Sequence, residues 1–128
     1  MKTLGIGVDI VENSRIKKSI INKKFLKRIF TSSEIKNSEK TINKTSYYSK
    51  RFAAKEAFAK ALGIGFRKGL NFNDISIIND KYGKPKIAIN KKLINIINNI
   101  FKTKNVHMHL SISDEKKHSI AFVVLNKK

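Results

Sequence analysis

The pattern of hydrophobic residues predicts five β-strands, most clearly in residues 4–12, where hydrophobic side chains recur at every second position. The other predicted strands are residues 74–80, 86–89, 106–114 and 119–125. The turn sequences "KYGKP" and "EKKH" separate the second strand from the third and the fourth from the fifth. We therefore expect two antiparallel hairpins in the second half of the chain.

Helical spacing of hydrophobic residues predicts short helices directly after the first strand. Asn13 or Ser14 can cap the first of them. The second is a basic amphipathic segment at residues 23–30. Thr31 stands three residues before Glu34, the spacing of a capping box, and this pair predicts the start of a third helix.

The strongest helix signal covers residues 45–62, a stretch rich in alanine that Gly63 can end. A glycine-rich loop follows at residues 63–70, and residues 90–101 predict a last amphipathic helix. The order is one strand, several helices, two strands, a helix and two strands. This order predicts a single α+β domain over residues 1–128, with a largely antiparallel sheet packed on a long central helix.

The first strand, "LGIGVDIVE", has two unlike faces. We expect one face to be buried, and it carries Leu4, Ile6, Val8 and Ile10. The other face carries Gly5, Gly7 and Asp9, residue types that strand interiors disfavour. We expect the glycines to clear space for a bulky ligand and Asp9 to have a functional role.

The composition is that of a folded domain with one modest core, because 41% of the 128 residues are hydrophobic. The absence of cysteine excludes disulfides, thiolate nucleophiles and zinc sites with Cys ligands. No apolar run approaches the roughly 20 residues of a membrane span, and the N-terminus is typical of a strand rather than of a secretory signal. The simplest compartment is the cytoplasm.

The net charge is +19, from 28 Lys and Arg against 9 Asp and Glu, and it favours an acidic partner. The chain is also rich in Asn and Ile, so part of this charge is explained by compositional drift at surface positions. A small basic nucleic-acid-binding protein is one alternative, since Tyr47, Tyr48 and Phe66 lie among basic residues. This alternative lacks a recognised nucleic-acid motif and leaves the acidic positions unexplained.

Glu56 is the only acidic residue between positions 40 and 73. Lys60 lies four residues later, on the same face of the predicted helix, so an ordinary surface ion pair is one interpretation. The helix is apolar nearly all round, however, and a buried carboxylate needs a cation. That cation is either Lys60 or a metal ion shared with Asp9. Magnesium takes one or two protein carboxylates together with phosphate oxygens, so the pair suggests phosphoryl transfer.

The sequence "HMH" places His107 and His109 on one face of a predicted strand, a spacing that can bind zinc. No third convincing ligand lies nearby in the sequence. Partly buried or surface imidazoles are the simpler interpretation.

Four stretches in order along the chain resemble the holo-acyl-carrier-protein synthases, the small phosphopantetheinyl transferases of bacterial fatty-acid synthesis. They are "GIGVDIVENSR", "RFAAKEAFAKALGIG", "YGKPKI" and "HLSISDEKKHSIAFVVL". The resemblance implies the 4′-phosphopantetheinyl transferase fold and transfer of the 4′-phosphopantetheine arm of coenzyme A to a serine of apo acyl carrier protein. It also implies magnesium, a cytoplasmic location and a homotrimer with active sites between subunits, and neither nucleic acid nor membrane as a partner.

Carried over residue by residue, the resemblance makes Asp9 and Glu56 the magnesium ligands. It places Lys60 against the diphosphate, where it either stabilises the transition state or, with a metal-bound water, helps to deprotonate the serine. It also implies contacts to coenzyme A from one further group of residues: Arg51, Gly83, Lys84, Pro85 and Ser113.

The resemblance further implies that the basic first helices dock the acidic carrier protein, through Arg15, Phe25 and Arg28. Many family members have a histidine at the position of Asp114, so a proton-shuttling role for that histidine does not transfer to this chain. The broad-range transferases of secondary metabolism are a nearer alternative, but they are about two such units fused, longer than this chain.

Overall fold

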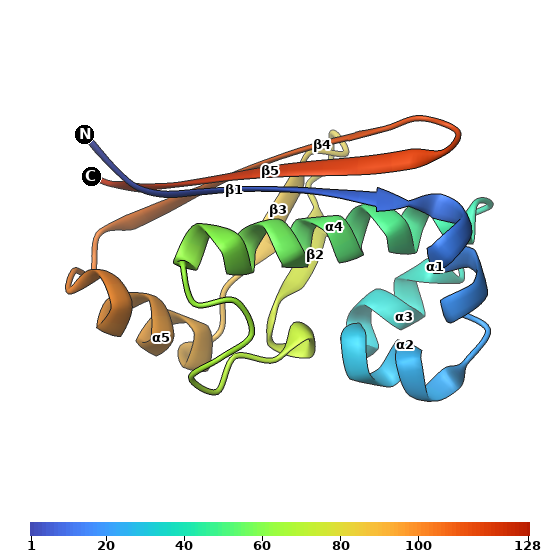
Figure 1. The fold of residues 1–128 in the computed structure, drawn as a ribbon, viewed down its shortest axis with the longest axis horizontal. Coiled ribbons are helices and arrows are strands. Elements are labelled where there is room, and N and C mark those ends of the chain that lie inside the picture. Colours follow the sequence, from blue (N-terminus) through green and yellow to red (C-terminus); the bar gives the residue numbers. More distant parts are fainter.

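The computed structural model describes residues 1–128 and has the predicted α+β architecture (Figure 1). No helix in it is both long and apolar enough to cross a membrane. In chain order the elements are β1 (Lys2–Glu12), α1 (Asn13–Ser19), α2 (Lys23–Ile29), α3 (Ser32–Ser38), α4 (Lys44–Leu62), the 3-10 helix η1 (Phe72–Asp74), β2 (Ser76–Asn79), β3 (Pro85–Ala88), α5 (Lys91–Phe101), β4 (Val106–Asp114) and β5 (His118–Lys127).

The strands form a three-stranded antiparallel sheet in the order β1-β5-β4 and a separate two-stranded sheet of β2 and β3. Both predicted hairpins are confirmed: β2 pairs antiparallel with β3, and β4 pairs antiparallel with β5 across the "EKKH" turn. Strands β1 and β4 are the two edges of the larger sheet, so residues on them lie on opposite sides of the central β5.

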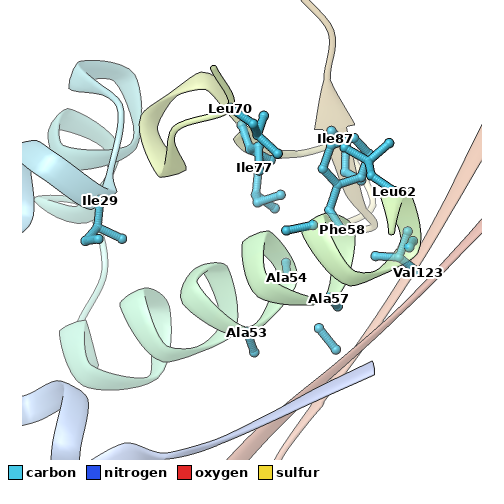
Figure 2. Packing of buried hydrophobic residues seen from close by; sticks show 14 of the residues in the cluster. Ile29, Ala53, Ala54, Ala57, Phe58, Leu62, Leu70, Ile77, Ile87 and Val123 are labelled. Atoms are coloured by element: carbon cyan, nitrogen blue, oxygen red, sulfur yellow. The ribbon is translucent and has the colours of Figure 1, made fainter. Parts of the chain in front are cut away.

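The central helix α4 runs along one face of the larger sheet, with α1, α2 and α3 gathered near its start and α5 near its end (Figure 1). Figure 2 shows that Ala53 and Ala57 of α4 face the strands, whereas Phe58 points the other way, toward Ile77 and Ile87. All five side chains are buried. The helix therefore forms the middle layer of the core and has little room for polar residues along most of its length.

The two faces of β1 are the reverse of the sequence prediction. Ile6, Val8 and Ile10 are 60%, 53% and 61% exposed, whereas Gly5 and Gly7 lie against α4. A Cβ atom on Gly5 would lie 2.0 Å from the carbonyl oxygen of Ala61, and one on Gly7 would lie 1.9 Å from that of Ala57. The glycines therefore admit the backbone of a helix, and the expectation that they clear space for a ligand is wrong.

The ends of the helices follow the sequence signals with one exception. The Thr31–Glu34 capping box is present, and Gly63 ends α4 in the left-handed conformation with φ of 81°. Neither Asn13 nor Ser14 caps α1, because the helix already begins at Asn13. The Asn13 side-chain amide instead donates to the carbonyl oxygens of Glu115 and Lys116, at 3.0 and 3.2 Å, and so ties the β4–β5 turn to the start of α1.

We predict that Gly7→Ala destabilises the protein by about 3 kcal/mol, because the new methyl group forces α4 away from β1. The matched control is Gly65→Ala, where no atom lies within 4 Å of the added Cβ and only the left-handed φ of 59° costs roughly 1–2 kcal/mol. Urea unfolding midpoints of the two variants test this. Equal midpoints would show that the close approach of helix and strand is not a constraint.

Candidate functional site

Asp9, Glu56 and Lys60 meet at the β1 edge of the sheet, as the sequence predicted. The Lys60 ammonium donates to the Asp9 carboxylate at 3.2 Å and to the carbonyl oxygen of Val8 at 2.9 Å. The side chain of Lys60 is 54% exposed, and that of Asp9 is 15% exposed. The surface ion pair considered between Glu56 and Lys60 does not form, because Lys60 bonds to β1 instead. Glu56 makes no ion pair in the structure.

The two carboxylates are in an environment that disfavours their negative charges. Burial raises the pKa of Asp9, and the hydrogen bond and charge of Lys60 only partly offset this rise. Burial also raises the pKa of Glu56, and the negative charge of Asp9 raises it further. The positive charge of Arg15 acts in the opposite direction on both groups. The positive charges near the site therefore do not fully compensate the negative charges of the two carboxylates.

This donor set suits a hard divalent cation such as magnesium, which prefers carboxylate oxygens and typically takes only one or two of them from the protein. Asp9 keeps one oxygen free of Lys60, and Glu56 keeps its whole carboxylate free. No group of three or more His, Asp or Glu side chains gathers anywhere in the structure. Other oxygen ligands, from water or from a substrate, would complete the coordination of such an ion.

Arg51 leaves α4 on a different side and lies in the wall of a second site, a cavity of about 690 Å³. Its guanidinium donates to the Asn79 side chain at 2.6 Å and to the carbonyl oxygen of Tyr47 at 3.2 Å, and it stacks 3.6 Å from the centre of the Tyr47 ring. Burial lowers the pKa of Arg51. Its Nε is buried without a partner, so the group retains a donor.

The structure brings only part of the predicted coenzyme A contacts to this cavity. Arg51, Gly83 and Pro85 all line it. Lys84 does not, because its side chain borders a neighbouring groove between β3 and β4. Ser113 is exposed and pairs across the strands with Ile120, on the face of the sheet that points away from α4.

The carboxylate site and the Arg51 cavity lie on opposite sides of the domain. Asp9 is on the edge strand β1, whereas the cavity is bordered by Ile112 and Asp114 of the other edge strand, β4. At 100° per residue, Arg51 and Lys60 project from α4 about 180° apart, separated by about 13 Å along its axis. One chain alone therefore does not bring the two halves of the predicted site together.

Asp114, which stands where the resembling family often has histidine, accepts a hydrogen bond from the Ser46 hydroxyl at 2.8 Å. It lines the Arg51 cavity together with Lys40 and Lys50. His118 lies across the turn and pairs with Glu115 at 3.0 Å, away from this cavity. Asp114 therefore places a negative charge in an otherwise basic pocket, and His118 does not replace the missing imidazole there.

A buried ion pair between Lys55 and Glu34 was not predicted from the sequence. The two groups lie 2.6 Å apart and are 0% and 1% exposed. Lys55 also donates to the carbonyl oxygens of Ile29 and Phe72, and Glu34 accepts from the backbone amide of Ile77. The pair thus joins α4 to α2, α3, η1 and β2. The capping-box signal identified Glu34, but only in its local role.

The residues expected to bind a carrier protein occupy α1 and α2. Phe25 and Arg28 line a groove of about 480 Å³ between these helices, together with Lys18 and Lys24. Phe25 is only partly available, because its ring stacks on Phe52 at 6.4 Å.

Arg15, the third of the residues expected to bind a carrier protein, is exposed on α1, near enough to the carboxylate site to lower the pKa of both Asp9 and Glu56. His107 and His109, the zinc candidates, are exposed on β4.

The comparisons with known proteins identify the family. The model of the 4′-phosphopantetheinyl transferase superfamily matches residues 5–123. A curated holo-[acyl-carrier-protein] synthase from Pelagibacter ubique is 59% identical over 128 residues, which is the full length of both chains.

Two solved structures share the fold. A holo-(acyl-carrier-protein) synthase from Bacillus anthracis in complex with CoA (3′,5′-ADP) has a TM-score of 0.82 and 35% identity, with both chains covered completely. A holo-[acyl-carrier-protein] synthase from Helicobacter pylori in complex with coenzyme A has a TM-score of 0.79 and 35% identity, and the match covers 94% of this chain and 99% of that one.

We predict that Glu56→Gln makes the metal-free protein more stable at neutral pH, raising the melting temperature by about 1–4 °C. The pKa of Glu56 is raised in the folded state, so its ionisation increasingly opposes folding as the pH rises from the ordinary pKa through the raised one. Below its ordinary pKa of 4.5 the carboxyl is protonated in both states and the difference should vanish. Melting curves against pH test this, with the exposed Glu39→Gln as control; a less stable variant at pH 7 would contradict it.

Proposed function

The chain belongs to the 4′-phosphopantetheinyl transferase superfamily, and from this we infer that it converts apo acyl carrier protein to the holo form. In this reaction a serine oxygen of the carrier protein forms a bond to the β-phosphorus of coenzyme A. The bond from that phosphorus to the bridging oxygen breaks, and adenosine 3′,5′-bisphosphate leaves with the electron pair. The serine proton is released. The observation that carries this inference is the pair of partly buried carboxylates with Lys60 beside them.

We propose that Asp9 and Glu56 hold a magnesium ion, which when bound would neutralise charge on the diphosphate of coenzyme A. Phosphoryl transfer asks the protein mainly for positioning and for compensation of charge on the phosphate oxygens. The Lys60 ammonium is half-exposed and still has a free proton beyond its two hydrogen bonds. We propose that it donates to a phosphate oxygen as negative charge moves onto the leaving group.

We propose the Arg51 cavity as the site of the nucleotide part of coenzyme A. Its wall supplies three cationic side chains, those of Arg51, Lys40 and Lys50, which suit a phosphorylated ligand. Gly83, with φ of 85°, presents bare backbone at the rim, so that a ligand can approach closely.

We further propose that the protein works as a homotrimer with its sites between copies, which would unite the two half-sites. The outer sheet face, formed by Ile6, Val8, Ile10, Ile120 and Phe122, is apolar and 40–61% exposed, a surface that a second copy would cover. A head-to-tail contact places the β1 edge of one copy against the β4 edge of the next. Such contacts form a ring when the rotation from copy to copy closes, and three copies make the smallest head-to-tail ring.

The basic groove of α1 and α2 is our proposed docking surface for the acidic carrier protein, with Arg15, Phe25 and Arg28 as contacts. The positive charge of the whole chain would speed the encounter. Fatty-acid biosynthesis in the cytoplasm is the proposed setting for this activity.

The assay that tests the function is mass spectrometry of apo acyl carrier protein incubated with coenzyme A, magnesium and this protein. We expect the carrier mass to increase by one phosphopantetheine group, and no increase with a carrier in which the acceptor serine is alanine. No gain of mass, together with tight binding of DNA or RNA at physiological salt, would favour the nucleic-acid alternative instead.

We predict that Asp9→Asn and Glu56→Gln each lower the rate of transfer roughly 100-fold or more while the fold is kept. Addition of magnesium should raise the melting temperature of the unmodified protein but not that of either variant. Glu39→Gln, an exposed glutamate outside the site, serves as control. Full activity in both variants would overturn the metal assignment.

The trimer is tested by Phe122→Lys, which places a charge on the outer sheet face without altering either half-site. Light scattering should give three times the chain mass for the unmodified protein and a lower mass for the variant, with transfer lost in parallel. Ile42→Lys, on a fully exposed side chain elsewhere, should remain trimeric and active. A monomeric unmodified protein with full activity would exclude sites shared between copies.

A further inference from the structure

Tyr82 is the one exposed tyrosine of the chain. Tyr82 is 84% exposed, whereas Tyr47 and Tyr48 are 8% and 3% exposed. The Tyr47 hydroxyl donates to the backbone carbonyl oxygen of Glu34, and the Tyr48 hydroxyl donates to the Ser38 hydroxyl. The Tyr82 hydroxyl makes no hydrogen bond. A large aromatic ring left open on the surface gains nothing from burial, so packing within the chain does not explain it.

The turn that carries Tyr82 is held rigidly. The Asp80 carboxylate accepts hydrogen bonds from the backbone amides of Tyr82 at 2.8 Å and Lys84 at 2.9 Å. The Gly83 amide donates to the carbonyl oxygen of Asp80 at 2.9 Å, and the Asn79 side chain donates to the carbonyl oxygen of Gly83 at 3.0 Å. The backbone at Tyr82 is therefore fixed, and the exposed ring has the Lys81 ammonium 5.1 Å from its centre. A fixed backbone lowers the entropic cost of using the ring to bind a ligand.

This turn forms part of the wall of the Arg51 cavity. Gly83, the next residue after Tyr82, lines the cavity together with Asn79 and Pro85. The same Asn79 that supports the turn accepts the 2.6 Å hydrogen bond from Arg51. Tyr82 thus stands beside the rim of the cavity, on a segment tied directly to the cavity's buried cation.

We propose that Tyr82 stacks on the adenine ring of bound coenzyme A and so strengthens binding of the donor. The inference rests on the proposed function. The cavity wall supplies cations for phosphate together with four hydrophobic side chains, and the Tyr82 ring would add an aromatic face for a flat base at the rim. Stacking on an aromatic side chain is tolerant of the base's hydrogen-bonding edge and strengthens binding about 5- to 100-fold.

The first test compares Tyr82→Ala with the matched variant Tyr82→Phe. We expect Tyr82→Ala to raise the KM for coenzyme A about 5- to 50-fold and to leave kcat within about twofold. The KM for the carrier protein should stay unchanged, because its proposed contacts lie on α1 and α2. Tyr82→Phe keeps the ring face and should behave like the unmodified protein. Since Tyr82 is exposed, neither change should affect folding.

A second test does not depend on turnover. In calorimetric titration with adenosine 3′,5′-bisphosphate, Tyr82→Ala should lose affinity about 5- to 50-fold relative to the unmodified protein. Tyr82→Phe should keep its affinity. The chain has three tyrosines and no tryptophan, so its fluorescence reports on tyrosine. The nucleotide should quench this fluorescence in the unmodified protein and much less in Tyr82→Phe, although that variant retains its affinity.

The outcomes separate the inference from the function on which it rests. If the unmodified protein transfers phosphopantetheine and Tyr82→Ala binds the nucleotide equally well, the stacking role is overturned and the proposed function stands. If Tyr82→Ala changes the molecular mass in light scattering rather than nucleotide affinity, the ring is an interface residue and the inference is also overturned. If the unmodified protein neither transfers nor binds, both proposals are overturned.

Discussion

The direct contact between the backbones of β1 and α4 is the constraint on which the rest of the structure depends. It is possible only because Gly5 and Gly7 have no Cβ atoms and because the facing turns of α4 carry alanine. Strand residues two apart point to the same side, so Asp9 is directed toward the helix as well. The short distance between strand and helix brings its carboxylate within reach of Lys60. The close contact between β1 and α4 therefore accounts both for the packing of the core and for the position of Asp9 beside Lys60.

Helix α4 organises the molecule because each of its sides contacts a different part of the structure. Alanines contact the sheet, Phe58 fills the core on the far side, and Lys55 is held in a buried ion pair. Two further polar side chains of α4, those of Arg51 and Glu56, emerge toward separate surfaces. A rigid helix of this kind fixes the distance between two half-sites even when no single chain can join them. The homotrimer that we propose would join two half-sites whose parts each chain already positions.

Most of the secondary structure could be predicted from the sequence, because turn residues and capping pairs such as Thr31–Glu34 mark the boundaries locally. The orientation of the two faces of β1 could not be predicted from the sequence. A period of two shows that a strand has two faces, but between Thr3 and Val11 the only charged residue is Asp9, so charge does not mark the solvent face. A glycine that contacts a helix also looks the same in the sequence as a glycine beside a gap. The Lys55–Glu34 pair, 21 residues apart, left no periodic signal at all.

The Lys55–Glu34 pair also limits how this chain can evolve. Replacing either residue alone leaves a charge buried without a partner, which typically costs about 3–5 kcal/mol, a large part of the stability of a small domain. Neutral drift proceeds by single substitutions. Single substitutions at these two positions are too destabilising to persist, so the pair should be retained while the surrounding surface residues diverge. A lineage that lost the pair must have changed both residues nearly together.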